Sequence, residues 1–355
     1  MREVAIIAYH QTPMVRDAGA KNDVELVMEA VHGVKNQLKI TNADIDFVCS
    51  GSCDYLGGAA FAFVGALDAI GAVPPMSESH VEMDAAWALY EAWLKIQTGH
   101  FNTALIYGFG KSSHGPMHEV LALQLDPYYL QPLWPDQISL AGLQARAMMD
   151  AGKLTEKQMA EVVVKSRKNA KANPNAQLKG DYTVEQLLAE PMLSSPLRKH
   201  DCPPITDGAS CLFIATKEIA EKMLAGTGKR PAYITGIDHR IESHQFGTRD
   251  LTQSTSTRIA GEHAGVKKGK VDIAELHTPF SHQELLVKEA LGLDDSTVIN
   301  ASGGPLAGNI FMSAGLDRIG AVATRIMNGE ANRGVAHATS GACLQQNLVA
   351  VLEGK

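Results

Sequence analysis

Three short polar segments carry the side chains best suited to chemistry in this 355-residue chain: HVEMDAA at 80–86, ELHTPFSH at 275–282 and SGGPLAGN at 302–309. Each is expected at a turn between a strand and a helix, where a helix N-terminus stabilises negative charge. Glu82 and Asp84 are acids able to take up a proton, and His277 and Asn309 can donate hydrogen bonds to an oxygen that becomes negative. The three segments therefore predict a single site that works through a stabilised anion.

The sequence around these segments predicts an α/β fold made of two related halves. Residues 4–8, 46–49 and 103–107 have the pattern of strands and 24–38 that of an amphipathic helix, an alternation typical of a largely parallel sheet covered by helices. KITNADIDFVCSG in one half matches VKKGKVDIAELHTPF in the other, and each continues with a strand, a long helix, a glycine and a strand. The predicted organisation is an N-terminal half at 1–111 and 201–230 and a C-terminal half at 231–355.

An inserted segment at 112–200 separates these parts. It begins with a stretch rich in Pro, Met, His and Tyr and continues with helical periods. Thr155 with Gln158, and Thr183 with Gln186, are spaced as capping boxes. An insertion of this kind on a duplicated core commonly forms a lid over a substrate site.

Composition excludes several classes of protein. The net charge of −7 excludes a generally basic nucleic-acid binder, and the five cysteines form no CxxC pair, so neither a disulfide framework nor a metal site is expected. The apolar run at 57–73 approaches membrane length, but Asp68 interrupts it and Pro74 and Pro75 close it, which favours a buried helix. The N-terminal apolar run is too short for a signal peptide. A reduced, cytoplasmic protein without membrane or nucleic-acid partners is expected.

Longer passages resemble the thiolase superfamily, closest to its sterol-carrier-protein type. The passages are ELHTPFSHQELLVKEALGL, VVVKSRKNAKANPNAQ with DCPPITDGASCLFIA, NASGGPLAGN and IQTGHFNTALIYGFGKSS. The resemblance implies a thiolase fold of five layers, αβαβα, with duplicated halves and an inserted loop domain. It also implies a homodimer and acyl-CoA thioester substrates, with coenzyme A as part of the substrate.

The chain departs from the family at the residues that carry thiolase catalysis. Counted back from IQTG without gaps, the position of the nucleophilic Cys is Glu82, and HVEMDAAW contains no Cys. Asn309 stands where the family carries a general-base His. Cys343 in ATSGACLQQN is offset by about two positions from the family's second catalytic Cys. His277 matches a family residue that helps form an oxyanion hole for the thioester carbonyl.

These departures favour enolate chemistry without an acyl-enzyme. Covalent acyl transfer needs a thiolate with a nearby base, whereas His277 and Asn309 need only donate to a developing oxyanion while Glu82 or Asp84 handles a proton. The leading prediction is cleavage or formation of a carbon–carbon bond by (retro-)aldol chemistry on an acyl-CoA. One alternative is a thiolase-like acyltransferase that uses Cys343. The other is a non-catalytic acyl-CoA-binding subunit of a heteromeric complex, and related aldolases pair with a small OB-fold, zinc-ribbon protein.

Each of these residues also has a purely structural interpretation. Glu82 and Asp84 are acids suited to capping a helix, Asn309 is an amide able to fix a loop, and Cys343 is a small apolar residue suited to a core. His282 and His337 are expected in the core or just behind the site. The residues predicted to contact coenzyme A are Lys165, Arg167, Lys168, Ser302 and Gly303, although a solvated helix face also explains the basic run.

Overall fold

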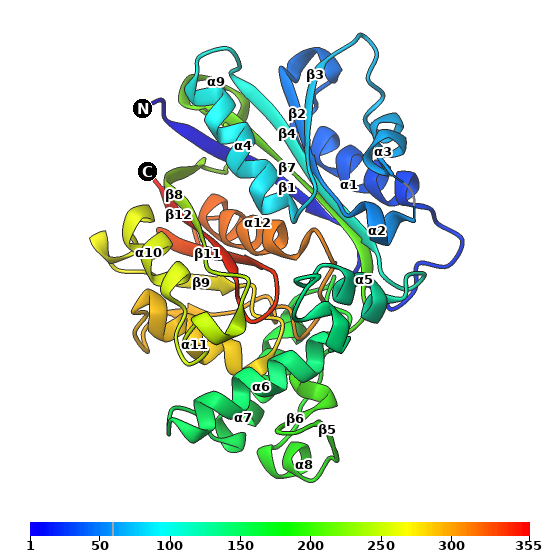
Figure 1. Cartoon of the computed structure of the whole chain (residues 1–355). Coiled ribbons are helices and arrows are strands. Elements are labelled where there is room, and N and C mark those ends of the chain that lie inside the picture. Colours follow the sequence, from blue (N-terminus) through cyan, green and yellow to red (C-terminus); the bar gives the residue numbers. More distant parts are fainter. Residues whose placement is uncertain (59) are drawn as a thin grey trace.

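A ten-stranded sheet forms the centre of the molecule (Figure 1). The structure is a computed structural model that describes residues 1–58 and 60–355. The strands of the first half are β1 (Val4–Gln11), β2 (Phe47–Gly51), β3 (Ser77–Val81), β4 (Thr103–Lys111) and β7 (Asp207–Thr216). Those of the second half are β8 (Ala232–Ile241), β9 (Ile273–Leu276), β10 (Val298–Ile299), β11 (Arg333–Ser340) and β12 (Gln346–Gly354).

The two halves repeat one topology. Their strand orders are β3-β2-β4-β7-β1 and β10-β9-β11-β12-β8. In each half the first three of these strands are parallel, and the fourth runs antiparallel to the third. The halves join edge to edge where β1 pairs with β8, through Ala5 with Tyr233 and Ile6 with Ala232. The predicted duplicated α/β fold class is confirmed.

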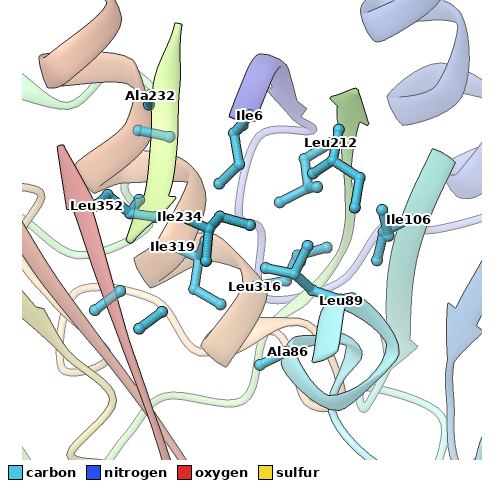
Figure 2. Close-up of a cluster of buried hydrophobic side chains, with 14 of the residues drawn as sticks. Ile6, Ala86, Leu89, Ile106, Leu212, Ala232, Ile234, Leu316, Ile319 and Leu352 are labelled. Atoms are coloured by element: carbon cyan, nitrogen blue, oxygen red, sulfur yellow. The ribbon is translucent and has the colours of Figure 1, made fainter. Parts of the chain in front are cut away.

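Helices form three layers that alternate with the two half-sheets. The outer helices of the first half are α1 (Asp23–Leu38), α3 (Phe63–Ile70) and α9 (Lys217–Leu224), and those of the second are α10 (Thr255–Ala264) and α11 (Ser281–Leu291). Between the half-sheets lie α4 (Ala85–Gln97) and α12 (Ala314–Met327). Figure 2 shows Ala86 and Leu89 of α4 beside Leu316 and Ile319 of α12, with strand side chains around them.

The middle helices are buried because their sequences are apolar nearly all round. Six consecutive residues of α4, from Ala85 to a half-exposed Tyr90, include five fully buried side chains. A helix without a polar face has to be covered on every side, and two half-sheets provide that cover. The result is the predicted αβαβα arrangement.

The inserted segment lies between β4 and β7. It contains α5 (Met117–Leu123), α6 (Gln137–Asp150), α7 (Glu156–Asn169), α8 (Val184–Leu188), β5 (Met192–Ser194) and β6 (Leu197–Arg198). Both predicted capping boxes are present: Thr155 Oγ1 accepts from Gln158 N, Gln158 Oε1 accepts from Thr155 N, and Thr183 and Gln186 repeat the pair. Helix α7 packs on α11 and so anchors the insert to the second half.

One helix prediction needs correction. Residues 57–73 are not one buried helix: α2 (Asp54–Gly57) ends at its start, α3 covers only Phe63–Ile70, and Val64 is exposed. Residue 59 of that run lies outside the described residues. Helix α4 begins at Ala85, at the end of the polar segment 80–86. Within 1–58 and 60–355, no helix combines the length and apolarity needed to cross a bilayer.

Short 3-10 helices connect several of these elements: η1 (Asn42–Asp44), η2 (Gln131–Leu133), η3 (Ala170–Ala172), η4 (Lys199–Asp201), η5 (Phe246–Thr248) and η6 (Val266–Lys268).

Candidate active site

A cavity of about 500 Å³ lies where the N-terminus of α4, the second half and the inserted segment meet. A volume of this size is typical of sites for small-molecule ligands. Four of the predicted catalytic residues line it, namely Asp84, His277, Asn309 and Cys343. Residues more than 250 positions apart in the sequence therefore share one cavity.

Asp84 caps two helices at once. Its Oδ1 accepts a hydrogen bond from Ala86 N of α4 at 2.9 Å and one from Leu316 N of α12 at 3.2 Å, while Oδ2 accepts from Gly315 N at 2.8 Å. Gly315 permits this approach, because a Cβ there would lie 2.6 Å from Asp84 Oδ1. Two helix N-termini thus stabilise a single carboxylate.

Burial opposes the charge on this carboxylate. The Asp84 side chain is almost wholly enclosed, and desolvation raises its pKa to about 6 against the lowering effect of the three N–H donors and Arg318. At neutral pH the carboxylate is ionised, yet its pKa lies close enough to neutral pH for it to take up a proton during a reaction. These are the properties of a general base.

His277 follows β9 and is electrically neutral. Burial, followed by the nearby His337 and Arg318, lowers its pKa to about 3. The Thr339 N–H points at Nδ1 from 3.4 Å, which assigns the proton of the neutral ring to Nε2. Nε2 lies 3.1 Å from Asn309 Oδ1 and donates to it. A neutral imidazole with a proton on Nε2 is a hydrogen-bond donor rather than an acid.

The amide of Asn309 is fixed from both sides. Its backbone N–H donates to Thr206 Oγ1 at 3.0 Å, and its Oδ1 accepts from His277. Within the described part of the chain, Asn309 Nδ2 has no hydrogen-bond partner, so it is left to donate to a molecule in the cavity. His277 and Asn309 can together stabilise a negative oxygen.

The thiols in the cavity are poor nucleophiles. Burial raises the pKa of Cys343 to about 12, and its Sγ donates to Leu140 O at 3.4 Å. Cys202, which also lines the cavity, has its pKa raised to about 12 by burial. A thiol acts as a nucleophile through its thiolate, and both groups remain protonated at neutral pH.

Glu82 lies outside this cavity. Its side chain is 47% exposed, its Oε1 accepts from Asp54 N at 2.6 Å, and its Oε2 is 3.5 Å from His80 Nε2. The prediction that Glu82 sits at a buried helix N-terminus is wrong, because α4 begins three residues later with Asp84 as its cap.

The residues predicted to contact coenzyme A also lie away from the cavity lining. Lys165 pairs with the buried Glu284, and the buried Arg167 donates to Leu306 O, so Arg167 is not on a solvated face. Ser302 donates to Glu275 through N and Oγ, and Gly303 O accepts from Ser166 Oγ. Lys168 is exposed. Contact with coenzyme A stays a prediction for these residues.

The sequence is similar over most of its length to acyl-CoA enzymes. It matches no protein-family model. An acetyl-CoA acetyltransferase from Methanothermobacter thermautotrophicus is 27% identical over 313 residues, which are 82% of this chain and 78% of that protein. Sterol carrier protein 2 from Homo sapiens is 24% identical over 321 residues, which are 82% of this chain and 57% of that protein.

A benzoylsuccinyl-CoA thiolase subunit, BbsB from Thauera aromatica, is 32% identical over 152 residues. That match spans 42% of this chain but only 38% of the subunit's own length.

Solved structures agree on the fold. The Ltp2-ChsH2(DUF35) aldolase superposes with a TM-score of 0.79 and 20% identity, covering 99% of this chain and 98% of that one. Human mitochondrial 3-ketoacyl-CoA thiolase superposes with a TM-score of 0.78 and 16% identity, covering 100% and 99%. The chain therefore has a thiolase fold.

Sequence reasoning missed several residues that shape the site. Thr206, which holds Asn309, and Thr339, which fixes the His277 ring, both line the cavity. Thr206 directly precedes the Asp-Gly of DCPPITDGASC, so its place at the start of a strand was readable. Its contact with Asn309, 103 residues away, was not.

A buried polar network lies behind Asp84. Asp317 Oδ1 accepts from Tyr9 OH at 3.0 Å, and Arg318 Nη1 lies 3.4 Å from Glu275 Oε2. Burial raises the pKa of Asp317 to about 6, against the influence of Arg318, and the charge of Asp84 adds to the increase. Asp317 lies in the first turn of α12, and Asp84 accepts hydrogen bonds at the N-terminus of the same helix. The charge of Asp84 therefore affects the pKa of Asp317.

Proposed function

We propose that this chain cleaves or forms a carbon–carbon bond in a β-hydroxyacyl-CoA by (retro-)aldol chemistry, without a cysteine acyl-enzyme. The observation that carries the proposal is the composition of the cavity: a carboxylate with a pKa of about 6, two neutral donors, and thiols that stay protonated. Names of similar proteins support the wider class, since they include an acetyl-CoA acetyltransferase and an aldolase.

In the cleavage direction, the Asp84 carboxylate removes the proton of the β-hydroxyl group. The Cα–Cβ bond breaks, the β-carbon becomes a carbonyl, and the electron pair moves onto the thioester carbonyl as an enolate. Asn309 Nδ2–H donates to the enolate oxygen, and His277 Nε2–H turns from Asn309 Oδ1 to the same oxygen. The proton held by Asp84 then returns to the α-carbon, which leaves a shorter acyl-CoA and regenerates the base.

Cys343 supports a second candidate, a thiolase-like acyltransferase, because it lines the same cavity. Two observations count against that role. Its thiol has no carboxylate or histidine partner in the described residues and donates to the Leu140 carbonyl, and burial keeps it protonated. The aldol proposal requires no thiolate.

Product analysis tests the proposal. The purified chain is incubated with β-hydroxyacyl-CoA thioesters, and mass spectrometry follows both the shortened acyl-CoA and the released carbonyl compound. Equal amounts of the two products are expected. If the chain instead transfers an acyl group derived from a 3-ketoacyl-CoA, the result would support the acyltransferase. Binding of acyl-CoA without any turnover would support the non-catalytic subunit.

We also propose that the chain acts as a homodimer and that a small OB-fold, zinc-ribbon protein joins it. The name of the aldolase neighbour, Ltp2-ChsH2(DUF35), joins two components, which supports a second subunit. Light scattering of the purified chain tests the dimer. Affinity purification from the native host tests the partner, and recovery of the chain alone in active form would contradict it.

A further inference from the structure

The inserted segment supplies much of the lining of the cavity. The wall is built from α5, the start of α6 and β5, with a loop of the second half beside them. Much of it is apolar, with contributions from Met117, Leu121, Ile138, Leu193, Ile205 and Phe311. On the proposed function, this wall surrounds the part of the acyl group beyond the bond that breaks.

The charged side chains in the described lining of this cavity are carboxylates. Its lining, as far as the described ranges 1–58 and 60–355 show it, includes two carboxyl groups, Asp84 and Asp136, and no Lys or Arg. Asp136 caps α6 and accepts from Ser139 N at 2.7 Å and Ser139 Oγ at 2.8 Å. Although burial opposes it, these hydrogen bonds lower the pKa of Asp136, so the group is ionised. Its hydrogen bonds are supplied from within the protein.

A second carboxylate on a substrate would meet unfavourable electrostatics here. It would exchange water for an apolar wall, face two carboxylates and find no permanent cation to pair with. His118 also lines the cavity, and its ring packs edge-on against Trp134 with the two ring centroids 6.1 Å apart. An uncharged acyl group avoids this unfavourable electrostatic effect and still makes apolar contacts with the wall.

We infer that the substrate is a bulky, uncharged acyl group carried on coenzyme A, and that this cavity discriminates against acyl groups with a terminal carboxylate. The inference rests on the proposed function, because it takes the cavity to be the acyl site. The discrimination arises from the charge and apolarity of the cavity lining and does not depend on the chemical step.

One position allows the charge of the wall to be reversed. Gln124, which follows α5, lines the cavity and has an exposed side chain, so Gln124→Lys adds a cation without disturbing the core. Leu123 is its neighbour, is 44% exposed and is absent from the cavity lining. Leu123→Lys therefore adds the same charge outside the cavity and is a matched control.

The test is a comparison of two unreactive ligands by calorimetry, S-alkyl-CoA thioethers of equal chain length that end in a methyl group or a carboxylate. The ratio of their dissociation constants cancels the contribution of coenzyme A itself. We expect the methyl ligand to bind about tenfold more tightly or better. Gln124→Lys is expected to reduce this ratio several-fold, and Leu123→Lys to leave it unchanged.

Equal affinities, or tighter binding of the carboxylate ligand, would overturn the inference and leave the aldol proposal standing. An equal effect of the two lysine variants would also overturn it, because discrimination would then not arise from the cavity. If neither ligand binds, the cavity is not an acyl-CoA site, and the inference and the proposed function are both wrong.

Discussion

At the scale of single residues, Asp84 shows how one side chain can serve two purposes. The carboxylate satisfies N–H groups at the ends of α4 and α12, which a structural cap would also do. Its pKa of about 6 and its place in the cavity lining are what a base requires. Capping and proton transfer are compatible because Oδ2 accepts only the hydrogen bond from Gly315 N and keeps a lone pair for a proton.

The pH dependence of the reaction follows from this carboxylate. Only ionised Asp84 can accept a proton, so kcat/KM is expected to fall about tenfold per pH unit below pH 6 and to level off above it. Asp84→Asn is expected to lower kcat by about 10²- to 10⁴-fold and to abolish this acid limb. A variant that kept the same acid limb would assign the titration to another group.

His277 is expected to act as a donor to the developing oxyanion. His277→Ala removes Nε2–H, and kcat is expected to fall by about 10²- to 10³-fold with little change in KM, because the donor acts mainly in the transition state. His277→Gln keeps an N–H donor and should recover part of the rate. Equal losses in the two variants would indicate a structural role.

Prediction from the sequence was uneven at this scale. Asp84, His277 and Asn309 were recognisable because each stands in a short polar segment at a strand-to-helix turn. Glu82 was misplaced because counting back from IQTG without gaps does not show where a helix begins. The hydrogen bonds of Asp84 to Gly315 and Leu316 join residues more than 230 positions apart, and no local pattern reports them.

At the scale of elements, local capping signals were reliable. The Thr155 capping box fixes the start of α7, whose other end packs near the SGG turn through Ser166 and Gly303. Such boxes are readable because both hydrogen bonds form within four residues of sequence. The beginning of α4 was not readable in this way, since part of its cap comes from contacts with α12.

Thr155→Ala is expected to reduce the free energy of unfolding by about 1 kcal/mol, because the Gln158 N–H loses its acceptor at the end of the helix. Denaturant unfolding measures this change. Thr155→Ser keeps the hydroxyl and should differ little from the unchanged chain. A similar loss in both variants would attribute the effect to the threonine methyl group instead.

At the scale of the whole molecule, the duplicated halves were predictable and their junction was not. Two similar runs of strands, loops and helices are visible in the sequence, so the repeated strand order followed. The pairing of β1 with β8 and the enclosure of α4 and α12 between the half-sheets depend on long-range packing. The cavity wall depends on how the insert folds over the second half, which composition alone does not specify.

Buried ionisable groups make the fold sensitive to acid. Burial lowers the pKa of His277 and His282 to about 3 and of His337 to about 4, and raises the pKa of Asp84 and Asp317 to about 6. The histidines contribute stability at neutral pH that is lost as pH falls below their ordinary value of 6.5. The aspartates contribute stability at low pH that is lost as pH rises through 6.

Between pH 6 and pH 4 the unfolded chain holds three histidine protons, and the folded chain holds two aspartate protons. Among these five groups the unfolded state therefore binds one more proton, and their contribution to stability is expected to fall by about 1.4 kcal/mol for each unit by which the pH is lowered. Denaturant titrations at several pH values measure the slope. His282→Gln removes one histidine and should lower the slope by about 1.4 kcal/mol per pH unit, whereas an unchanged slope would contradict this origin.

The most direct test of the central claim is the rate at which a Cys343→Ser variant cleaves a β-hydroxyacyl-CoA. Cys343 lines the cavity, but its protonated thiol has no step in the aldol reaction. The account predicts turnover comparable to that of the unchanged chain, with the shortened acyl-CoA and the carbonyl product still formed in equal amounts. Loss of turnover in this variant, together with an acyl adduct on Cys343 of the unchanged chain, would contradict it.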